Sequence, residues 1–321
     1  MAGLNRDLPL GWRGAKSSIV RVSEKRRAMK VYLVDGTYEL FRHFFGAPSH
    51  RNAKGHEVAA VRSAVGSVLG MLTDGATHIG VATDHVIESF RNALWPGYKT
   101  GVGVDPELWS QAWPLEVALV GLGVKVWPMV AVEADDALGS AAAVACDDPA
   151  VDQVLICTPD KDLGQCVRGT RVVQLDRRKS LLLDEEGIVA KFGVAPASIP
   201  DYLALVGDSA DGFPGLPGWG AKSASAVLAR WGHIEEIPED PSMWEVDLRS
   251  AAKLSATLKV NAEAARLFKH LATLRIDRAL LSSVDELRWR GPTEDFVTIC
   301  AEIDAPSLAS RASALAEARS L

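Results

Sequence analysis

The chain carries a dense acidic stretch, Glu133-Ala134-Asp135-Asp136, between a short apolar run and a helix-like run of small residues. Two like charges 4 Å apart repel by roughly 4 kcal/mol at an effective dielectric of 20, so crowded carboxylates cost stability unless a cation neutralises them. Acidic residues in the first turn of a helix also complement its dipole and cap it. Taken alone, the stretch favours a helix start over a metal site.

Further acidic residues lie at the ends of other apolar runs, and together they favour a metal site over a helix start. Asp35 follows Val31–Val34, and Asp84 ends the run ATHIGVATD. Asp160 and Asp162 follow a third run, and in an extended turn residues i and i+2 point the same way, so both can face one ion. Hard divalent ions are held by oxygen ligands gathered from several segments, so these sites together predict a metal centre.

A fourth acidic pair, Asp208 and Asp211, precedes a loop rich in glycine and proline. At positions i and i+3 the pair shares one face of a helix. The loop glycines free backbone N–H groups just before a helix N-terminus, which makes an anion site, and Lys222 adds a positive charge beside it. These glycines are Gly215, Gly218 and Gly220. A generic glycine-rich turn is the alternative.

The stretch FRNALWPGYKTGVGVD mixes cations with an aromatic side chain. Arg91, Tyr98 and Lys99 are the residue types that grip phosphates and stack on a base. A plain surface loop with glycine turns explains the composition nearly as well.

The apolar runs predict the elements that position these residues. Runs typical of buried strands, such as Val31–Val34, Val154–Cys157 and VKVWPMVAV, alternate with helical patterns such as Val58–Leu72. We therefore expect an α/β fold with a largely parallel central sheet that carries acidic residues at the carboxyl ends of its strands, where open α/β sheets bind ligands. PELWSQAWPLEVALVGLG predicts one helix. TRVVQLDRRKSLLLD predicts a β-hairpin whose basic tip, Arg177-Arg178-Lys179, is interpreted as a solvated turn.

The composition is that of an ordinary globular protein. Its 321 residues are 48% hydrophobic and 24% charged, with no secretory signal and no apolar run long enough to span a membrane. The four cysteines form no C-x-x-C pair, so we expect reduced thiols in a cytosol, without disulfides or zinc.

The net charge of −6 is unevenly distributed. Residues 1–30 hold eight Lys/Arg and two Asp/Glu, and removing this +6 leaves −12 for residues 31–321. A focused acidic pocket beside basic ridges fits a metal-dependent enzyme acting on phosphates as well as a solvated acidic surface does. Residues 1–29 lack periodicity and are expected to be a flexible basic extension, either an upstream translation start, a basic tail touching nucleic acid or, least favoured, a targeting peptide.

Six motifs, in order and spacing, resemble the bacterial and phage 5′-nucleases, the flap endonuclease/5′→3′ exonuclease family that includes the N-terminal domain of DNA polymerase I. The motifs are LVDGTYELFR, VATD, FRNALWPGYK, VEADD, TPDKD and LVGDSADGFPGLPGWGAKSA, and the likeness covers residues 30 to about 278. The domains we expect are the extension at 1–29, a PIN-like α/β nuclease domain over 30–195 and a helical DNA-binding lobe over 196–321.

The resemblance also implies a role for each candidate residue. The family's full acidic metal set, holding two or more Mg²⁺ or Mn²⁺ ions, corresponds to Asp35, Asp84, Glu133, Asp135, Asp136, Asp160, Asp162, Asp208 and Asp211. Lys99 resembles the catalytic lysine, Arg91 and Arg42 resemble phosphate-contacting cations, and Tyr98 resembles a stacking aromatic. The loop of Gly215, Gly218, Gly220 and Lys222 resembles the helix-three-turn-helix that holds duplex DNA, with K⁺ on its backbone carbonyls.

The implied activity is a structure-specific 5′-nuclease of DNA replication and repair that cuts 5′ flaps and trims 5′ ends by two-metal-ion hydrolysis. The expected partners are DNA with 5′ flaps, 5′ overhangs or nicks, and RNA-primed DNA. We expect a free-standing, monomeric nuclease of the bacterial cytoplasm that acts at the nucleoid and not at a membrane. Val102 stands where the family usually has an arginine, three residues after the lysine, so the arch that screens single strands is expected to be less basic.

Other functions compete with this one. A DNA-binding scaffold with weak hydrolysis would not need all nine acids. A PIN-type RNA nuclease shares the sheet and the strand-end acids but would not explain the glycine-rich loop or Asp208 and Asp211. The Asp35-Gly36-Thr37 trio is also found in phosphatases of the haloacid dehalogenase type, but Leu33 occupies the position of their nucleophilic aspartate.

Overall fold

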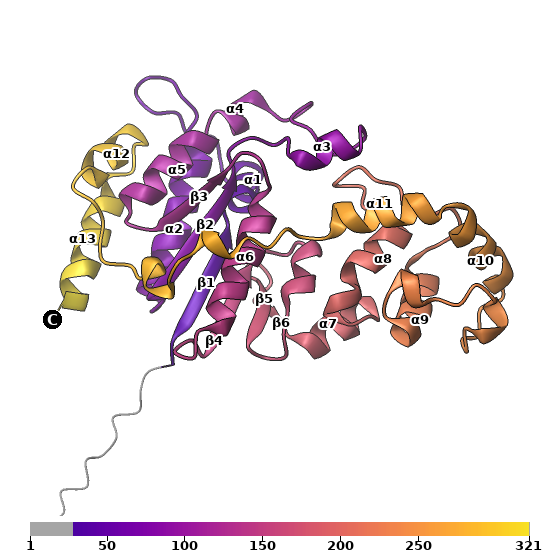
Figure 1. Cartoon of the computed structure of the whole chain (residues 1–321). Helices are drawn as coiled ribbons and strands as arrows, with labels where there is room; N and C mark the ends of the chain where they lie inside the picture. Colours follow the sequence, from indigo (N-terminus) through magenta and orange to yellow (C-terminus); the bar gives the residue numbers. More distant parts are fainter. Residues whose placement is uncertain (1–27, 321) are drawn as a thin grey trace, which may run out of the picture.

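A six-stranded sheet forms the centre of the computed structural model, which describes residues 28–320 (Figure 1). The strands lie in the order β3-β2-β1-β4-β5-β6, and every pair is parallel except β5 with β6. Their bounds are β1 Lys30–Asp35, β2 His78–Asp84, β3 Lys125–Met129, β4 Gln153–Cys157, β5 Val172–Asp176 and β6 Leu181–Leu183. The predicted largely parallel α/β sheet and the hairpin at Arg177-Arg178-Lys179 are both confirmed.

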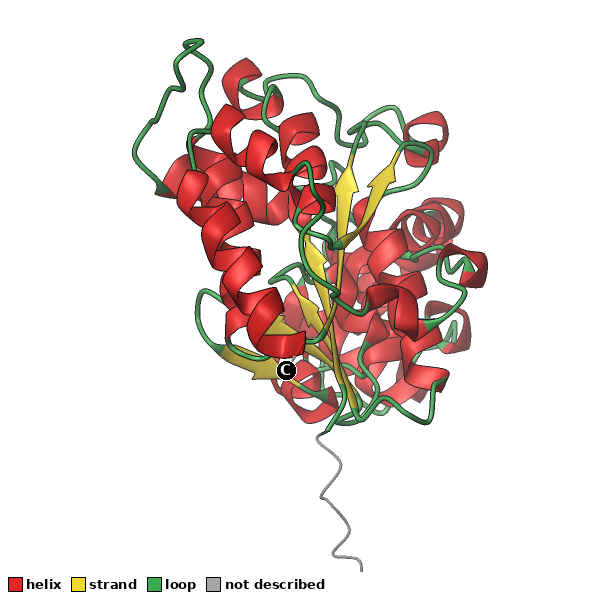
Figure 2. Cartoon of the chain, turned by 90° about the vertical axis from the view of Figure 1, so that its left-hand side faces the viewer, coloured by secondary structure: helices red, strands yellow, loops and turns green. Residues whose placement is uncertain are grey.

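Helices cover both faces of this sheet (Figure 2). Side chains alternate along each strand, so Val34 faces one side with α1 (Gly36–Gly46), α2 (Ala59–Thr73) and α5 (Ala112–Gly121), while Leu33 faces α6 (Ala134–Asp147) on the other. Burial on both faces explains why the strands are apolar throughout rather than alternating.

A second, helical unit has its own core, which includes Phe213, Trp244 and Phe268. Its helices are α7 Glu185–Phe192, α8 Ile199–Val206, α9 Ala221–Trp231, α10 Ala251–Val260 and α11 Ala262–Ala272. The remaining helices are α3 Phe90–Leu94, α4 Pro106–Trp109, α12 Phe296–Glu302 and α13 Pro306–Ser320. Short 3₁₀ turns are η1 Asp162–Cys166, η2 Pro196–Ser198, η3 Ile234–Glu236, η4 Pro241–Met243, η5 Arg278–Leu280 and η6 Val284–Leu287.

The helical lobe predicted over 196–321 ends earlier in the structure. After α11 the chain returns to the sheet, where the Trp289 amide donates to the Thr77 carbonyl at 2.9 Å. Phe296 of α12 and Ala312 of α13 are buried with α2 and α5, at the end of the molecule opposite α9 and α10 (Figure 1). The helical lobe therefore ends near residue 277, and residues 278–320 complete the α/β core.

The helix predicted for PELWSQAWPLEVALVGLG is interrupted between α4 and α5. Pro114 has no N–H to donate to the Ser110 carbonyl, so a continuous helix cannot pass this point. At the break, Gln111 is buried and its Oε1 accepts hydrogen bonds from the amides of Ala60 at 3.1 Å and Val61 at 3.3 Å. Gln111 thus satisfies two free N–H groups in the first turn of α2.

The N-terminal extension and any membrane-spanning helix were the remaining expectations about the fold. The predicted basic extension lies outside the described residues, except for its last two positions. Within residues 28–320 no single helix is long and apolar enough to cross a bilayer. One pair of helices, Glu185–Phe192 and Pro196–Val206, reaches the required length and apolar composition only when the two are taken together, and the pair is bent by 45°.

Phe296→Ala tests the return of the chain to the α/β core. Phe296 is 1% exposed and its neighbour Val297 is 64% exposed. Truncating the buried ring should lower the free energy of unfolding by about 3–5 kcal/mol, whereas Val297→Ala should change it by less than about 0.5 kcal/mol. Urea unfolding followed by circular dichroism measures both. Equal, small losses would contradict the packing described for α12.

Candidate metal centre

The carboxyl ends of β1, β2 and β4 meet at one edge of the sheet. Asp35, the last residue of β1, accepts hydrogen bonds from the Tyr38 amide at 2.7 Å and from Thr158 Oγ1, just after β4, at 3.0 Å. Asp84 ends β2 and accepts from the amide of Ala134, the first residue of α6, at 2.8 Å. Parallel register therefore gathers acidic groups that are far apart in the sequence.

Four carboxylates form what we call the first acidic group. They are Asp35, Asp84, Asp135 and Asp160. Burial raises the pKa of Asp35 to about 7, and the charges of Asp84 and Asp160 act in the same direction. Burial together with the charges of Asp160 and Asp35 also raises the pKa of Asp135 well above its usual value. Asp160 is the exposed member of the group. Like charges that raise one another's pKa need a cation to remain ionised together.

The second acidic group consists of Asp162, Asp208 and Asp211. All three are buried, and one carboxylate oxygen of each lies within 4.8 Å of the others. Asp162 Oδ1 is buried and has no hydrogen-bond partner among residues 28–320. Buried carboxylate oxygens, one of them unsatisfied, are the donor set that Mg²⁺ and Mn²⁺ prefer, so the residues fit a divalent cation.

Two lysines reach the second acidic group. Lys99 Nζ lies 3.1 Å from Asp211 Oδ1 and 2.9 Å from Glu133 Oε2. Lys161 Nζ lies 2.6 Å from Asp208 Oδ2. Burial would lower the pKa of Lys99, but the neighbouring charges of Asp211 and Glu133 raise it well above its usual value, so Lys99 stays charged.

The structure gives Arg91 and Asp136 a different role from the predicted ones. Arg91 is 1% exposed, and its two terminal nitrogens donate to the two oxygens of Asp136, each at 2.8 Å. Asp136 also accepts from the amides of Glu133 at 2.9 Å and Arg275 at 2.8 Å. Arg91 Nε donates to the Leu271 carbonyl at 2.8 Å. This buried pair joins α3, α6 and the end of α11, so Arg91 has no access to a phosphate and Asp136 has no free oxygen for a metal.

Tyr98 is also placed otherwise than predicted. The ring is 3% exposed, and its hydroxyl lies 3.2 Å from both Glu133 Oε2 and Asp211 Oδ2. Glu133 accepts in addition from Ser89 Oγ at 2.6 Å and lies 3.3 Å from Arg91 Nη1. A buried tyrosine cannot stack on a base, and here it fixes two acidic side chains.

Lys99 is positioned by a backbone contact between two loops. The Lys99 amide donates to the Asp211 carbonyl at 3.0 Å, and Trp95 Nε1 donates to the Gly212 carbonyl at 3.0 Å. A Cβ at Gly212, whose φ is 82°, would lie 2.0 Å from the Gly97 carbonyl oxygen. Only glycine permits this approach.

The glycine-rich loop divides into a packed and an exposed part. Gly215 has φ of 70° and is buried, and a Cβ there would lie 2.4–2.6 Å from the backbone of residues 205–207. It therefore serves close packing rather than anion binding. Gly218 and Gly220 are exposed, and so is Lys222 in the first turn of α9.

Arg42 lies on α1, which follows Asp35 directly, and it belongs to neither acidic group; Arg42 Nη2 donates to Glu39 Oε2 at 2.6 Å. Lys161 and Thr158 contact the acidic groups but were not among the candidate residues. A lysine flanked by Asp160 and Asp162 was a usable signal, because it had to lie beside both carboxylates. Thr158 gave no signal beyond its place after a strand.

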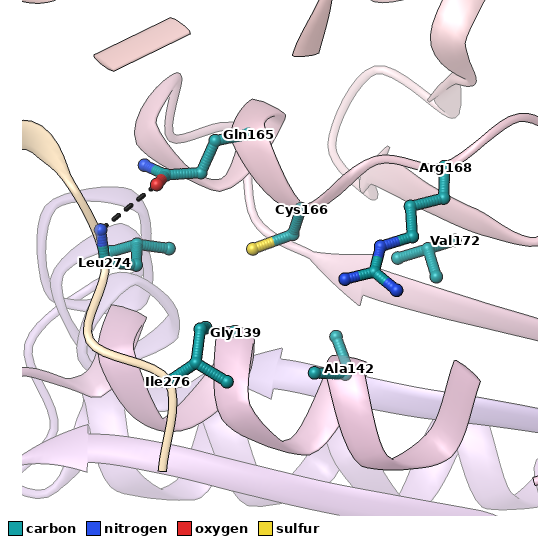
Figure 3. A pocket seen from close by; sticks show the side chains of 9 residues that line it. Gly139, Ala142, Gln165, Cys166, Arg168, Val172, Leu274 and Ile276 are labelled. Atoms are coloured by element: carbon teal, nitrogen blue, oxygen red, sulfur yellow. Dashed lines mark hydrogen bonds between the residues drawn. The ribbon is translucent and has the colours of Figure 1, made fainter. Parts of the chain in front are cut away.

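A pocket of about 110 Å³ lies between α6, η1 and the segment after α11, and no member of the two acidic groups lines it (Figure 3). Its lining includes Cys166, Arg168 and Gln165, whose Oε1 accepts from the Leu274 amide at 3.0 Å. No carboxylate lines it. Burial raises the pKa of the Cys166 thiol to about 12, so this thiol is an inert packing group.

Comparison with known proteins accords with this arrangement. Residues 30–193 match the family described as "5'-3' exonuclease, N-terminal resolvase-like domain", and residues 194–295 match "5'-3' exonuclease, C-terminal SAM fold". The chain belongs to the 5′-3′ exonuclease family. The second match runs past residue 277, where the structure returns to the sheet, and residues 296–321 lie beyond both.

Relatives include DNA polymerase I of Pseudomonas aeruginosa, 33% identical over 79% of this chain and 28% of that protein. A 5'-3' exonuclease of Buchnera aphidicola is 28% identical over 80% of this chain and 90% of its own length. The chain thus spans under a third of the polymerase relatives and nearly the whole of the exonuclease.

Solved structures share the fold. The T5 D15 protein co-crystallised with metal ions aligns with a TM-score of 0.61 at 17% identity, covering 90% of this chain and 98% of that one. Flap endonuclease-1 from Methanococcus jannaschii aligns with a TM-score of 0.56 at 15% identity, covering 91% and 94%.

Asp136→Asn and Asp160→Asn should separate the structural acid from the metal-binding acids. Losing the charge of Asp136 removes the two-pronged partner of buried Arg91 and leaves only the longer contact with Glu133, so the free energy of unfolding should fall by about 3–5 kcal/mol. Asp160→Asn relieves repulsion, so the metal-free protein should be as stable as the parent or more stable, while Mn²⁺ binding by calorimetry weakens. Equal destabilisation by both changes would contradict this division.

Proposed function

We propose that this chain is a divalent-metal-dependent 5′-nuclease that hydrolyses DNA phosphodiester bonds, cutting 5′ flaps and trimming 5′ ends. The observation that carries the proposal is the meeting of the two acidic groups with Lys99 at one edge of the sheet. Family membership supports it, and so does the likeness to a T5 flap endonuclease solved with DNA and metal ions.

Each group of residues has a part in this activity. The first acidic group would hold one Mg²⁺ or Mn²⁺ ion and the second another, with Glu133 beside Lys99 between them. Bound divalent ions supply a lowered pKa for water and neutralise phosphate charge. Lys99, fixed by its contacts with Glu133 and Asp211, adds electrostatic stabilisation of the phosphate as charge develops.

DNA contacts follow from the exposed residues. Lys222, at the N-terminal turn of α9, would contact a duplex phosphate, and the loop carbonyls before α9 would hold K⁺. Val102 is 91% exposed in the loop between α3 and α4, so this part of the arch offers an apolar side chain to a single strand. We expect 5′ flaps, 5′ overhangs, nicks and RNA-primed DNA as substrates of a monomer that works at the bacterial nucleoid, in the cytoplasm.

A cleavage assay on labelled 5′-flap DNA tests the function. The parent should cut in Mg²⁺ or Mn²⁺ and not in EDTA. Asp160→Asn should lower the rate of cutting by a factor of about 100 or more. Binding of the same DNA in Ca²⁺ by Asp160→Asn should be equal or tighter, because one negative charge is removed near the phosphate.

Asp285→Asn is the matched control, since Asp285 is exposed and pairs with Arg290, and the neighbouring Arg288 bridges to His78 at the amino end of β2, opposite the acidic groups. It should cut like the parent. Binding without any cutting by the parent would instead indicate a DNA-binding scaffold, and cutting of RNA alone would indicate an RNA nuclease.

A further inference from the structure

A buried carboxylate on α1 gathers cations from two separate segments. Glu39 is 2% exposed and accepts from Arg42 Nη2 at 2.6 Å and from Ser67 Oγ of α2 at 3.1 Å. Arg177 Nη1, from the turn after β5, lies 3.4 Å from Glu39 Oε1, and His43 Nε2 lies 3.4 Å from Oε2. Burial would raise the pKa of Glu39, yet His43, Arg177 and Arg42 together lower it to about 2.

The cluster carries excess positive charge. Two guanidinium groups, which remain charged at any ordinary pH, face one carboxylate, so at least one unit is left over. Arg177 is fixed by donating to Ser67 Oγ at 3.0 Å, so the two arginines are held in place rather than left free in solvent. Their side chains are still 24% and 21% exposed.

Unused donors remain on this cluster. A guanidinium has five N–H donors, and the contacts of Arg177 with Ser67 Oγ, the Ser67 carbonyl and Glu39 use at most three of them. A purely structural ion pair has no need of a second arginine or of an unpaired donor. A planar fork with free N–H groups is suited to the oxygens of a phosphate.

The cluster lies at the same edge of the sheet as the metal centre. Glu39 is four residues after Asp35, and Arg177 follows Asp176, the last residue of β5. Because β1, β4 and β5 are parallel, their carboxyl ends lie on the same side of the sheet. A nucleic-acid strand bound at the acidic groups would therefore lie on the side of the sheet that carries Arg42 and Arg177.

We propose that Arg177, held beside Arg42 by Glu39, forms a second phosphate subsite for the DNA backbone next to the metal centre. This rests on the proposed nuclease function and adds to it a DNA-binding residue that the sequence analysis interpreted as part of a solvated turn. The ligand is a backbone phosphodiester, so the contact is independent of base sequence.

Anisotropy of fluorescent 5′-flap DNA, titrated in Ca²⁺ at several salt concentrations, tests the subsite. Arg177→Met should weaken binding about tenfold at low salt and reduce the slope of log affinity against log salt by about 1. Arg177→Lys keeps the charge and should keep the slope, with a smaller loss of affinity because the fork is gone. Arg290→Met, at the opposite sheet edge and 66% exposed, should behave like the parent.

The outcomes separate this subsite from the nuclease function. Unchanged affinity and slope in a folded Arg177→Met protein would overturn the subsite while the parent still cuts flap DNA. If Arg177→Met does not fold, an affinity and slope of Arg177→Lys equal to those of the parent would overturn it instead. A parent that binds no DNA in this assay would overturn both proposals.

Discussion

The repulsion among carboxylates at one edge of the sheet is the constraint around which this structure is arranged. Asp35, Asp135 and Asp162 have pKa values raised by burial and by the charges of neighbouring carboxylates, Asp160 among them in each case. Such a cluster remains ionised only with cations nearby, and Lys99 and Lys161 supply two of them. Divalent ions would supply the rest, so the feature that costs stability is the one that gives the site its chemistry.

Lys99 is held beside these carboxylates by contacts between the α/β core and the helical lobe. The chain around Gly97 lies against Gly212 with no room for a Cβ, and Tyr98 donates to acids on both sides. The buried pair of Arg91 and Asp136 joins α3 to α6 and to the residues after α11. Lys99, for which we propose a contact with phosphate, is thus positioned by groups that are themselves buried.

The sequence was sufficient to predict the sheet, the strand-end acids and Lys99, because apolar runs and motif order locate positions along the chain. It was not sufficient to predict which way individual side chains point. Asp135 and Asp136 are adjacent, but successive helix residues point about 100° apart, so one faces the acidic groups while the other faces Arg91. Tyr98 and Arg91 are types that bind nucleic acid when exposed, and only tertiary packing shows that both are buried. Likewise, the pattern of α12 predicts an amphipathic helix but not the surface that it covers.

The central claim is that the two acidic groups each bind a divalent ion. Anomalous diffraction from crystals soaked in Mn²⁺ tests it most directly. We expect two strong peaks, one against Asp35, Asp135 and Asp160 and one against Asp162, Asp208 and Asp211, with none against Asp136. A map without peaks at these carboxylates, or with manganese bound at Asp136, would contradict it.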